Sequence, residues 1–358
     1  MTQTTGNPWA TINRFVYITC VGQATVPKDG GGFVEEKVIV VEDLRREFVL
    51  SKDGKRKTAL DGISFDVNRG EIFGILGHNN AGKTTLIKIL TTLLLPTSGK
   101  AEVLGLDVYP RKNEKPIRRR INVVMGGERG LYYRLTARQN MKFFADLYGI
   151  PKKTQHELIE DLLELVKLTP AADQRVENFS RGMKQRLHIA KALVNDPEIL
   201  FLDEPTIGMD PEITRDVIAL VRKLAVDGTT ILLTTHHMRE AEALCDRVAI
   251  MASGKIVAMG TLSELKEMAA DASIVRITTV MDPYAVTLLM EDMEGISSVK
   301  TELVSGRYVT SVGVEDGRAM FDRLNTMFDG FDIRGIEYDD PTLEDAYLHI
   351  LGGEGDSY

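Results

Sequence analysis

The chain has 358 residues, of which 43% are hydrophobic and 27% charged, and 44 basic and 52 acidic side chains give a formal net charge of −8. This length exceeds one average domain, so we expect one large domain and a smaller attachment. The composition excludes a disordered or fibrous protein. The acidic balance argues against bare nucleic acid as the main partner, and no nucleic-acid partner is expected.

The sequence contains no signal for a disulfide, a metal-binding cysteine cluster or a membrane-spanning helix. The two cysteines, Cys20 and Cys245, show no metal-ligand spacing and no paired framework, which predicts a reducing compartment without disulfides. The longest apolar runs, such as Phe15 to Val21, fall far short of the roughly 18 to 20 residues that span a bilayer. The polar stretch before Phe15 disfavours a signal peptide. Residues 1–36 are predicted to be an extension whose role the sequence does not indicate.

The first predicted elements are strands at 37–41 and 62–67, followed by a buried strand at 72–76. That strand leads directly into a glycine-containing loop. From Lys83 onward the apolar residues follow helical spacing, so the predicted order is strand, loop, helix.

A basic run lies further along the chain. It comprises Arg111, Lys112, Lys115, Arg118, Arg119 and Arg120. A solvated surface face is the favoured interpretation, and contact with anionic lipid headgroups is the alternative.

The middle of the chain, from Thr136 to Asn195, is predicted to be mostly helical, with a break at Pro170. We interpret residues of about 130–196 as a helical subdomain. Short apolar strands are predicted at 199–202 and 231–233, with a helix around 217–224 between them. This alternation is typical of parallel α/β units.

The pattern of predicted helices and strands changes after residue 268. The predicted elements, in order, are a strand at 273–280, a helix at 284–293, strands at 299–304 and 308–314, a helix at 318–328 and a strand at 333–338. This is the β-α-β-β-α-β order of ferredoxin-like domains, so residues 269–358 are predicted to form a small α+β domain. Its apolar positions indicate core packing. A ligand-binding regulatory role and a dimer-stabilising role are both compatible with it.

The loop carries the first chemical motif. Gly77-His78-Asn79-Asn80-Ala81-Gly82-Lys83-Thr84 fits the pattern G-x-x-x-x-G-K-[ST], in which backbone N–H groups and a helix N-terminus cradle phosphates. Lys83 is predicted to hold the β- and γ-phosphates of ATP, and Thr84 to offer its hydroxyl to Mg²⁺. Thr85 is predicted to support the phosphates from the first helical turn.

Two adjacent carboxylates, Asp203 and Glu204, follow the predicted strand at 199–202. Adjacent acids at the end of a buried strand are costly for packing, because an unpaired buried charge is expensive. We therefore predict that Asp203 serves the metal and that Glu204 polarises the attacking water. Exposed loop acids are the alternative interpretation.

Together with the motif that follows, the phosphate-binding pattern and the two carboxylates resemble those of the nucleotide-binding subunits of ABC transporters. Phe179-Ser180-Arg181-Gly182-Met183 is similar to their signature L-S-G-G-Q, with Arg181 and Met183 as departures. The resemblance implies a P-loop NTPase cassette of α/β class over residues 37–268. It also implies that two cassettes form a head-to-tail homodimer, in which Ser180 and Gly182 contact ATP held by the partner.

Further residues receive roles from the same resemblance. Gly208-Met209-Asp210 resembles the D-loop, in which Asp210 is placed at the nucleotide, and Thr234-Thr235-His236 resembles the switch whose histidine contacts the γ-phosphate. His237 is interpreted as a bystander. Phe48 matches the aromatic residue that stacks on adenine, with core packing as its alternative.

Two departures from the family lie near the nucleotide. Asn80 stands where glycine is usual, and we expect ATP binding to survive because asparagine tolerates left-handed backbone better than most residues. The Q-loop lacks its glutamine, since Met125 leads into Gly126, Gly127, Glu128 and Arg129. Glu128 or a water is the candidate substitute.

The resemblance extends to a branch of the family. His78 replaces the commoner proline, as in A-type and drug-resistance cassettes, and the segment from Pro341 to Asp345 with Leu348 is similar to the end of bacterial drug, antibiotic and sodium exporter ATPases. It implies an ATPase on the cytoplasmic face of the membrane that energises export through a separate permease. The alternative is a soluble ABC ATPase acting on ribosomes or DNA, which the single cassette and the lack of sustained heptads disfavour.

Overall fold

The structure is a computed structural model. It describes residues 36–49, 56–125, 130–268, 273–279, 290, 293–304, 307–314, 317–328, 333–339 and 342–352. The predictions for residues 1–35, for the Q-loop at 126–129 and for most of the helix at 284–293 therefore fall outside the described residues. The chain divides into two compact units, Met1–Phe73 with Gly82–Thr235, and Gly74–Ala81 with His236–Tyr358. Among the described residues no helix combines the length and the hydrophobicity needed to cross a membrane.

The first unit contains a four-stranded antiparallel sheet in the order β2-β1-β4-β5. Its strands are β1 (Lys37–Val49), β2 (Arg56–Asn68), β4 (Ser98–Val103) and β5 (Leu106–Asp107). Strand β1 continues well past its predicted end at residue 41, and β2 begins before its predicted start at residue 62. Cross-strand hydrogen bonds continue both strands through polar stretches in which apolar and polar residues do not alternate clearly. The register shifts along β1 are β-bulges or similar irregularities.

The central sheet has the order β10-β9-β3-β8-β7-β6. Its strands are β3 (Ile72–Leu76), β6 (Ile121–Val124), β7 (Ile199–Asp203), β8 (Thr230–Thr235), β9 (Arg247–Ala252) and β10 (Lys255–Thr261). Strands β6, β7 and β8 run parallel, and every residue of β3, β7 and β8 is buried. The predicted parallel α/β core is confirmed, since such sheets are covered on both faces.

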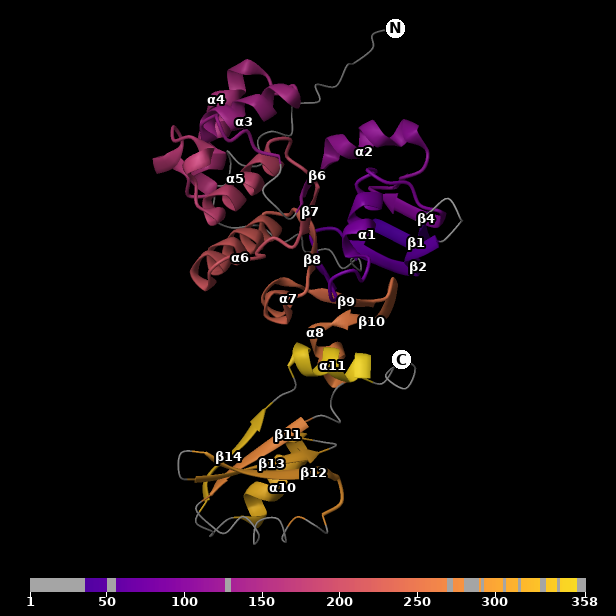
Figure 1. Ribbon diagram of the computed structural model, residues 1–358, viewed down its shortest axis with the longest axis vertical. Coiled ribbons are helices and arrows are strands. Elements are labelled where there is room, and N and C mark those ends of the chain that lie inside the picture. The colour runs from indigo at the N-terminus through magenta and orange to yellow at the C-terminus, as the bar shows by residue number, and fades with distance from the viewer. Residues whose placement is uncertain are drawn as a thin grey trace, which may run out of the picture. The chain divides into compact units, whose positions relative to one another are not determined.

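The helices of the first unit lie to either side of β7 and β8, with α1 on one side and α6 on the other (Figure 1). They are α1 (Lys83–Leu90), η2 (Arg111–Asn113), α2 (Glu114–Arg120), α3 (Ala137–Leu147), α4 (Lys152–Leu165), η3 (Thr169–Ala171), η4 (Val176–Asn178), α5 (Arg181–Leu193) and α6 (Pro211–Val226). The predicted break at Pro170 coincides with η3, because proline suits the first turn of a short helix. A capping box between Thr136 and Gln139 fixes the start of α3.

The predicted basic run occupies η2 and α2, and two of its arginines bind protein partners. Arg118 donates to the hydroxyl of Thr92 at 2.7 Å, and Arg120 donates to the carboxylate of Glu198. These contacts anchor α2 to the first unit.

The second unit contains a four-stranded antiparallel sheet in the order β12-β13-β11-β14. Its elements are β11 (Ser273–Thr279), β12 (Ile296–Val304), β13 (Arg307–Val314), α10 (Gly317–Met327) and β14 (Ile333–Asp339). Each matches a predicted element in type and order. Buried residues of β11, β13 and α10, including Ile277, Val312 and Leu324, form one core. This core confirms that the apolar positions serve packing.

Three more helices belong to the second unit, namely α7 (Met238–Leu244), α8 (Leu262–Glu267) and α11 (Leu343–Gly352). The sequence pattern had indicated a motif at the place of α11 but no helix.

Candidate active site

Asp203 ends β7 beside Thr234 of β8, its partner in the parallel register. The carboxylate is only 5% exposed and receives two hydroxyl groups. Thr234 donates from Oγ1 to Oδ1 at 2.6 Å, and Thr84 donates from Oγ1 to Oδ2 at 3.0 Å. Both carboxylate oxygens are thus satisfied, which fixes the orientation of this buried acid. The structure brings the two predicted metal ligands, Thr84 and Asp203, together.

Glu204 points to a different partner from Asp203. Its Oε1 lies 3.1 Å from Nζ of Lys83, and the two side chains are 14% and 6% exposed. The backbone of Glu204 is left-handed, with φ of 52°, and its N–H donates to the carbonyl of Thr234 at 3.0 Å. Such a conformation is strained for a residue with a Cβ and is concentrated at functional sites. The turn separates the two adjacent acids, as their different predicted roles require.

The glycine loop is shaped by close approach to β9. A Cβ on Gly77 would lie 2.3 Å from the carbonyl oxygen of Met251, so only glycine fits. Asn80 has φ of 72° and Gly82 has φ of 111°. Asn80 thus has the left-handed backbone that asparagine tolerates better than most residues, and the survival of ATP binding stays a prediction. The side chains from His78 to Asn80 are exposed, whereas Ala81 is buried.

Helix α5 begins at the predicted signature motif. Ser180 is its exposed N-cap and accepts a hydrogen bond from the N–H of Met183 at 3.2 Å. Gly182 is buried, and a Cβ there would lie 2.5 Å from Cγ2 of Ile213 on α6. Besides the predicted phosphate contact, the tight packing of α5 against α6 favours glycine at this position.

Arg181, a departure from the family pattern, contacts the predicted D-loop. Its Nη1 donates to the carbonyl oxygen of Gly208 at 2.8 Å, and Gly208 has a left-handed φ of 66°. Asp210 is exposed and is the N-cap of α6, where Pro211 occupies the first position. The sequence showed both segments but did not show that Arg181 joins them.

Two predicted nucleotide contacts are partly accessible. Phe48 on β1 is half-buried, with the guanidinium of Arg46 over its ring at 4.6 Å, so it is not a core residue. His236 is half-buried immediately after β8, and its ring lies 4.0 Å from that of His237 between centroids. His237 is therefore packed against the predicted switch residue, a contact that the sequence did not reveal.

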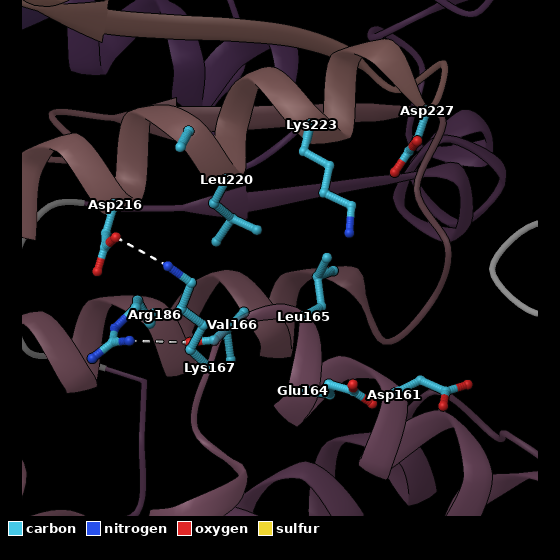
Figure 2. A pocket seen from close by; sticks show the side chains of 11 residues that line it. Asp161, Glu164, Leu165, Val166, Lys167, Arg186, Asp216, Leu220, Lys223 and Asp227 are labelled. Atoms are coloured by element: carbon cyan, nitrogen blue, oxygen red, sulfur yellow. Dashed lines mark hydrogen bonds and ion pairs between the residues drawn. The ribbon is translucent and has the colours of Figure 1, made fainter. Parts of the chain in front are cut away.

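A separate pocket of about 490 Å³ is lined by residues around α4, α5 and α6 (Figure 2). Its rim carries both signs of charge, including the ion pair of Lys167 and Asp216 at 3.2 Å. Burial raises the pKa of Asp161, and the nearby charges of Glu157 and Glu164 raise it further. None of the predicted site residues lines this pocket, and its mixed charge selects no ligand class.

Comparison with known proteins agrees with this geometry. The sequence profile of the family described as "ABC transporter" matches residues 60–207. The daunorubicin resistance ATP-binding protein DrrA3 of Streptomyces coeruleorubidus is 35% identical over 83% of this chain and 92% of its own length. The chain belongs to the ATP-binding subunits of ABC transporters.

Two other similarities refine this assignment. The linearmycin resistance ATP-binding protein LnrL of Bacillus subtilis (strain 168) is 31% identical over 86% of this chain and 98% of its own length. A dimeric ATP-binding cassette solved in a post-hydrolysis state with ADP and phosphate has a TM-score of 0.57 and 23% identity, and covers 63% of this chain and 98% of its own. The latter similarity shows the fold alone. That fold is the P-loop cassette that the sequence analysis predicted.

Membership in this ABC transporter family confirms several predictions. The chain is an ATP-hydrolysing transport subunit, and the alternative of a soluble ATPase acting on ribosomes or DNA is disfavoured, since the relatives are named as transport and resistance proteins. The individual roles of the site residues stay predictions.

Proposed function

We propose that this ABC subunit drives export through a separate membrane permease, with the cargo belonging to the drug or antibiotic class. The observation that carries the proposal is the convergence of Lys83, Thr84, Asp203 and Glu204, of which Lys83 and Asp203 are buried, Glu204 is half-buried and Thr84 is exposed. Two relatives that match nearly their full length are named for antibiotic resistance, which supports the cargo class. Selectivity among cargoes belongs to the permease.

The donor set suits Mg²⁺. This ion binds nucleotide sites through one or two carboxylates, hydroxyl groups, water and the phosphates of the substrate. Asp203 supplies one carboxylate and Thr84 a hydroxyl 3.0 Å from it. Bound Mg²⁺ would neutralise charge on the β- and γ-phosphates. We assign Thr84 and Asp203 as the residues that hold it.

The ion pair of Lys83 and Glu204 links binding to hydrolysis. Both side chains are largely removed from water, and the ion pair compensates charge on each of them. The β- and γ-phosphates of ATP are competing anionic partners for Lys83. Drawing Lys83 toward them leaves the Glu204 carboxylate to accept a hydrogen bond from the attacking water. His236 contacts the γ-phosphate in this scheme.

The exposed start of α5 fits a site completed by a second copy of the chain. Ser180 and the first N–H groups of α5 present a helix N-terminus, which favours anions. Gly182 and Asp210 lie at the starts of α5 and α6. We propose a head-to-tail homodimer in which this surface closes on ATP held by the partner. The dimeric form of the similar cassette supports this arrangement.

The permease-docking surface that we propose comprises Tyr132, Phe143 and Leu147, which are 48%, 39% and 68% exposed. The rings of Tyr132 and Phe143 pack at 4.7 Å between centroids. Clustered exposed apolar side chains mark interaction surfaces, and aromatic residues are enriched there. Tyr132 follows closely on the predicted Q-loop along the chain. Docking there would hold the subunit at the cytoplasmic face of the membrane.

Substitution Glu204→Gln tests the proposed chemistry. The variant should bind ATP and lose steady-state phosphate release, because the amide does not accept the proton from water. Glu212→Gln, at the exposed first turn of α6, is the matched control and should hydrolyse ATP normally. Full turnover by Glu204→Gln would remove the role assigned to that residue.

Membrane fractionation tests the transport role independently. Co-expression with the permease encoded nearest to this chain should move the subunit to the membrane fraction. A triple substitution of the docking surface, Tyr132→Ser, Phe143→Ser and Leu147→Ser, should return it to the supernatant with ATP binding retained. A subunit that stays in the supernatant with every candidate permease would contradict the proposal.

A further inference from the structure

Strand β1 carries two adjacent arginines whose side chains take different partners. Arg45 forms ion pairs with Asp43, at 2.9 Å, and with Asp61. The next residue, Arg46, donates from Nη1 to the carbonyl oxygen of Leu95 at 3.1 Å. Neighbours in a strand point to opposite faces, so the two arginines serve different parts of the molecule.

The guanidinium of Arg46 lies over the ring of Phe48. Its Cζ is 4.6 Å from the ring centroid, within the range of a cation–π interaction. The two residues are two positions apart in β1, so their side chains project from the same face, and both are half-buried. One face of the Phe48 ring is thus occupied by Arg46, and a base can stack only on the opposite face.

This arrangement leaves one donor of Arg46 unsatisfied. Its Nε is buried and has no hydrogen-bond partner among the residues that the structure describes. A buried donor without an acceptor costs free energy, so other contacts must hold the guanidinium in place. They are the carbonyl of Leu95 and the ring of Phe48. The contact between Arg46 and Phe48 therefore orients both side chains.

The Leu95 anchor belongs to the segment that connects α1 to β4. Thr97 fastens this segment to β1, because its N–H donates to the carbonyl oxygen of Arg45 at 2.8 Å and its hydroxyl accepts the N–H of Glu47 at 3.0 Å. Helix α1 begins at the end of the predicted phosphate loop. Arg46 therefore joins the aromatic ring of β1 to the segment that follows the phosphate-loop helix.

We propose that Arg46 is a positioning residue for the nucleotide base, because it holds the ring of Phe48 in place and leaves the opposite face for adenine. The inference rests on the proposed function and on the predicted stacking of adenine on Phe48. A ring already held in one orientation loses less side-chain entropy when a base stacks on it. The guanidinium also draws electron density toward its own face of the ring, which favours an electron-rich purine on the other face.

The substitution Arg46→Met removes the charge and keeps an unbranched side chain. We expect the Kd for MgADP, measured by isothermal titration calorimetry on the full chain, to rise about 2- to 10-fold, the range of one cation–π contact. The Kd for magnesium pyrophosphate, which has the phosphates of ADP without the nucleoside, should not change. Arg45→Met, at the neighbouring arginine, is the matched control and should leave both Kd values unchanged.

The two ligands separate a positioning role from a structural one. A rise by the same factor for MgADP and for pyrophosphate in Arg46→Met would overturn the proposal, because damage to the fold or to phosphate binding does not depend on the base. An unchanged or lower Kd for MgADP would also overturn it. In that case Arg46 either does not support the ring or competes with the base for it.

A double-mutant cycle with Phe48→Leu tests whether Arg46 acts through the ring. Phe48→Leu should itself raise the Kd for MgADP, since it removes the stacking surface. Adding Arg46→Met should raise the Kd no further, because the ring that Arg46 positions is already absent. Additive effects of the two substitutions would overturn the proposal.

Lys83→Ala separates this inference from the proposed function. It should raise the Kd for both MgADP and pyrophosphate, because Lys83 is assigned to the phosphates. If Lys83→Ala weakens binding and Arg46→Met does not, the positioning role fails and the phosphate loop stands. If Lys83→Ala changes neither Kd, the assignment of the phosphate loop fails.

Discussion

The corner formed by Thr84, Asp203 and Thr234, where we propose that Mg²⁺ binds, and the start of helix α5 belong to the same unit. They differ in how complete they are. Asp203 is buried and both its oxygens accept hydrogen bonds from Thr84 and Thr234. Ser180 at the start of α5 is exposed, and its side chain only caps its own helix. The corner is organised within one chain, whereas the helix start gains its proposed function only against a partner. Under the proposed function, each subunit prepares the metal site by itself, and hydrolysis depends on assembly with a partner.

The largest expected effect is at the corner. Asp203→Asn keeps the shape and removes the charge, so we expect kcat to fall by at least about 100-fold, as when one electrostatic group is removed from a preorganised site. Phosphate release at saturating MgATP measures it. Binding of ATP without Mg²⁺ should persist, and loss of that binding would instead indicate a folding defect.

Thr234→Val tests whether the orientation of Asp203 needs the hydroxyl of the neighbouring strand. The variant leaves Oδ1 of buried Asp203 without its 2.6 Å donor, which should cost about 1–3 kcal/mol of unfolding free energy. Urea unfolding measures this loss. Thr235→Val, at the next buried position of β8, is the comparison variant, and an equal loss in both would show that Asp203 does not depend on Thr234.

At the α5 start, Ser180→Ala removes the cap and the proposed phosphate contact together. Thr136→Ala removes the cap of α3 in the same way, so both variants should lose about 1 kcal/mol of stability. Only Ser180→Ala should reduce ATP-dependent dimerisation in the Glu204→Gln background, by about 10-fold, as measured by light scattering. Equal dimerisation in the two variants would contradict a shared site.

The smallest effect is expected at Arg181→Ala. This change removes the 2.8 Å bond to Gly208 on the exposed side of α5, and one such bond contributes roughly 1 kcal/mol. We expect a fall in kcat of about 2- to 5-fold, with nucleotide affinity of the single subunit preserved. Arg215→Ala on α6 is a suitable control, and identical kinetics in both variants would show that Arg181 does not position the D-loop.

Several site features could be predicted because they depend on local chemistry. The left-handed conformation expected of Asn80 is present, since few residue types tolerate it in a phosphate loop. Asp203 and Glu204 follow a buried strand as predicted. Helix α11 was missed even though Thr342 and Asp345 have the spacing of a capping box. The interpretation of that segment as a family motif left its local signal unused.

Other features depend on residues that are distant in sequence. The requirement for glycine at residue 77 comes from the Met251 carbonyl on β9, and the hydroxyl on Asp203 comes from Thr234 on the neighbouring strand. No local pattern contains these pairs.

The sequence by itself determined the motif that fits a phosphate-binding loop and the order of the described elements after residue 268, because these follow from short-range spacing and hydrophobic period. Its resemblance to ABC transporter subunits implied the cassette. Only the tertiary structure decided which side chains pair. It placed Lys83 against Glu204 and Arg181 against Gly208. Such partners are selected by the packing of strands and helices, which brings distant residues within hydrogen-bonding distance.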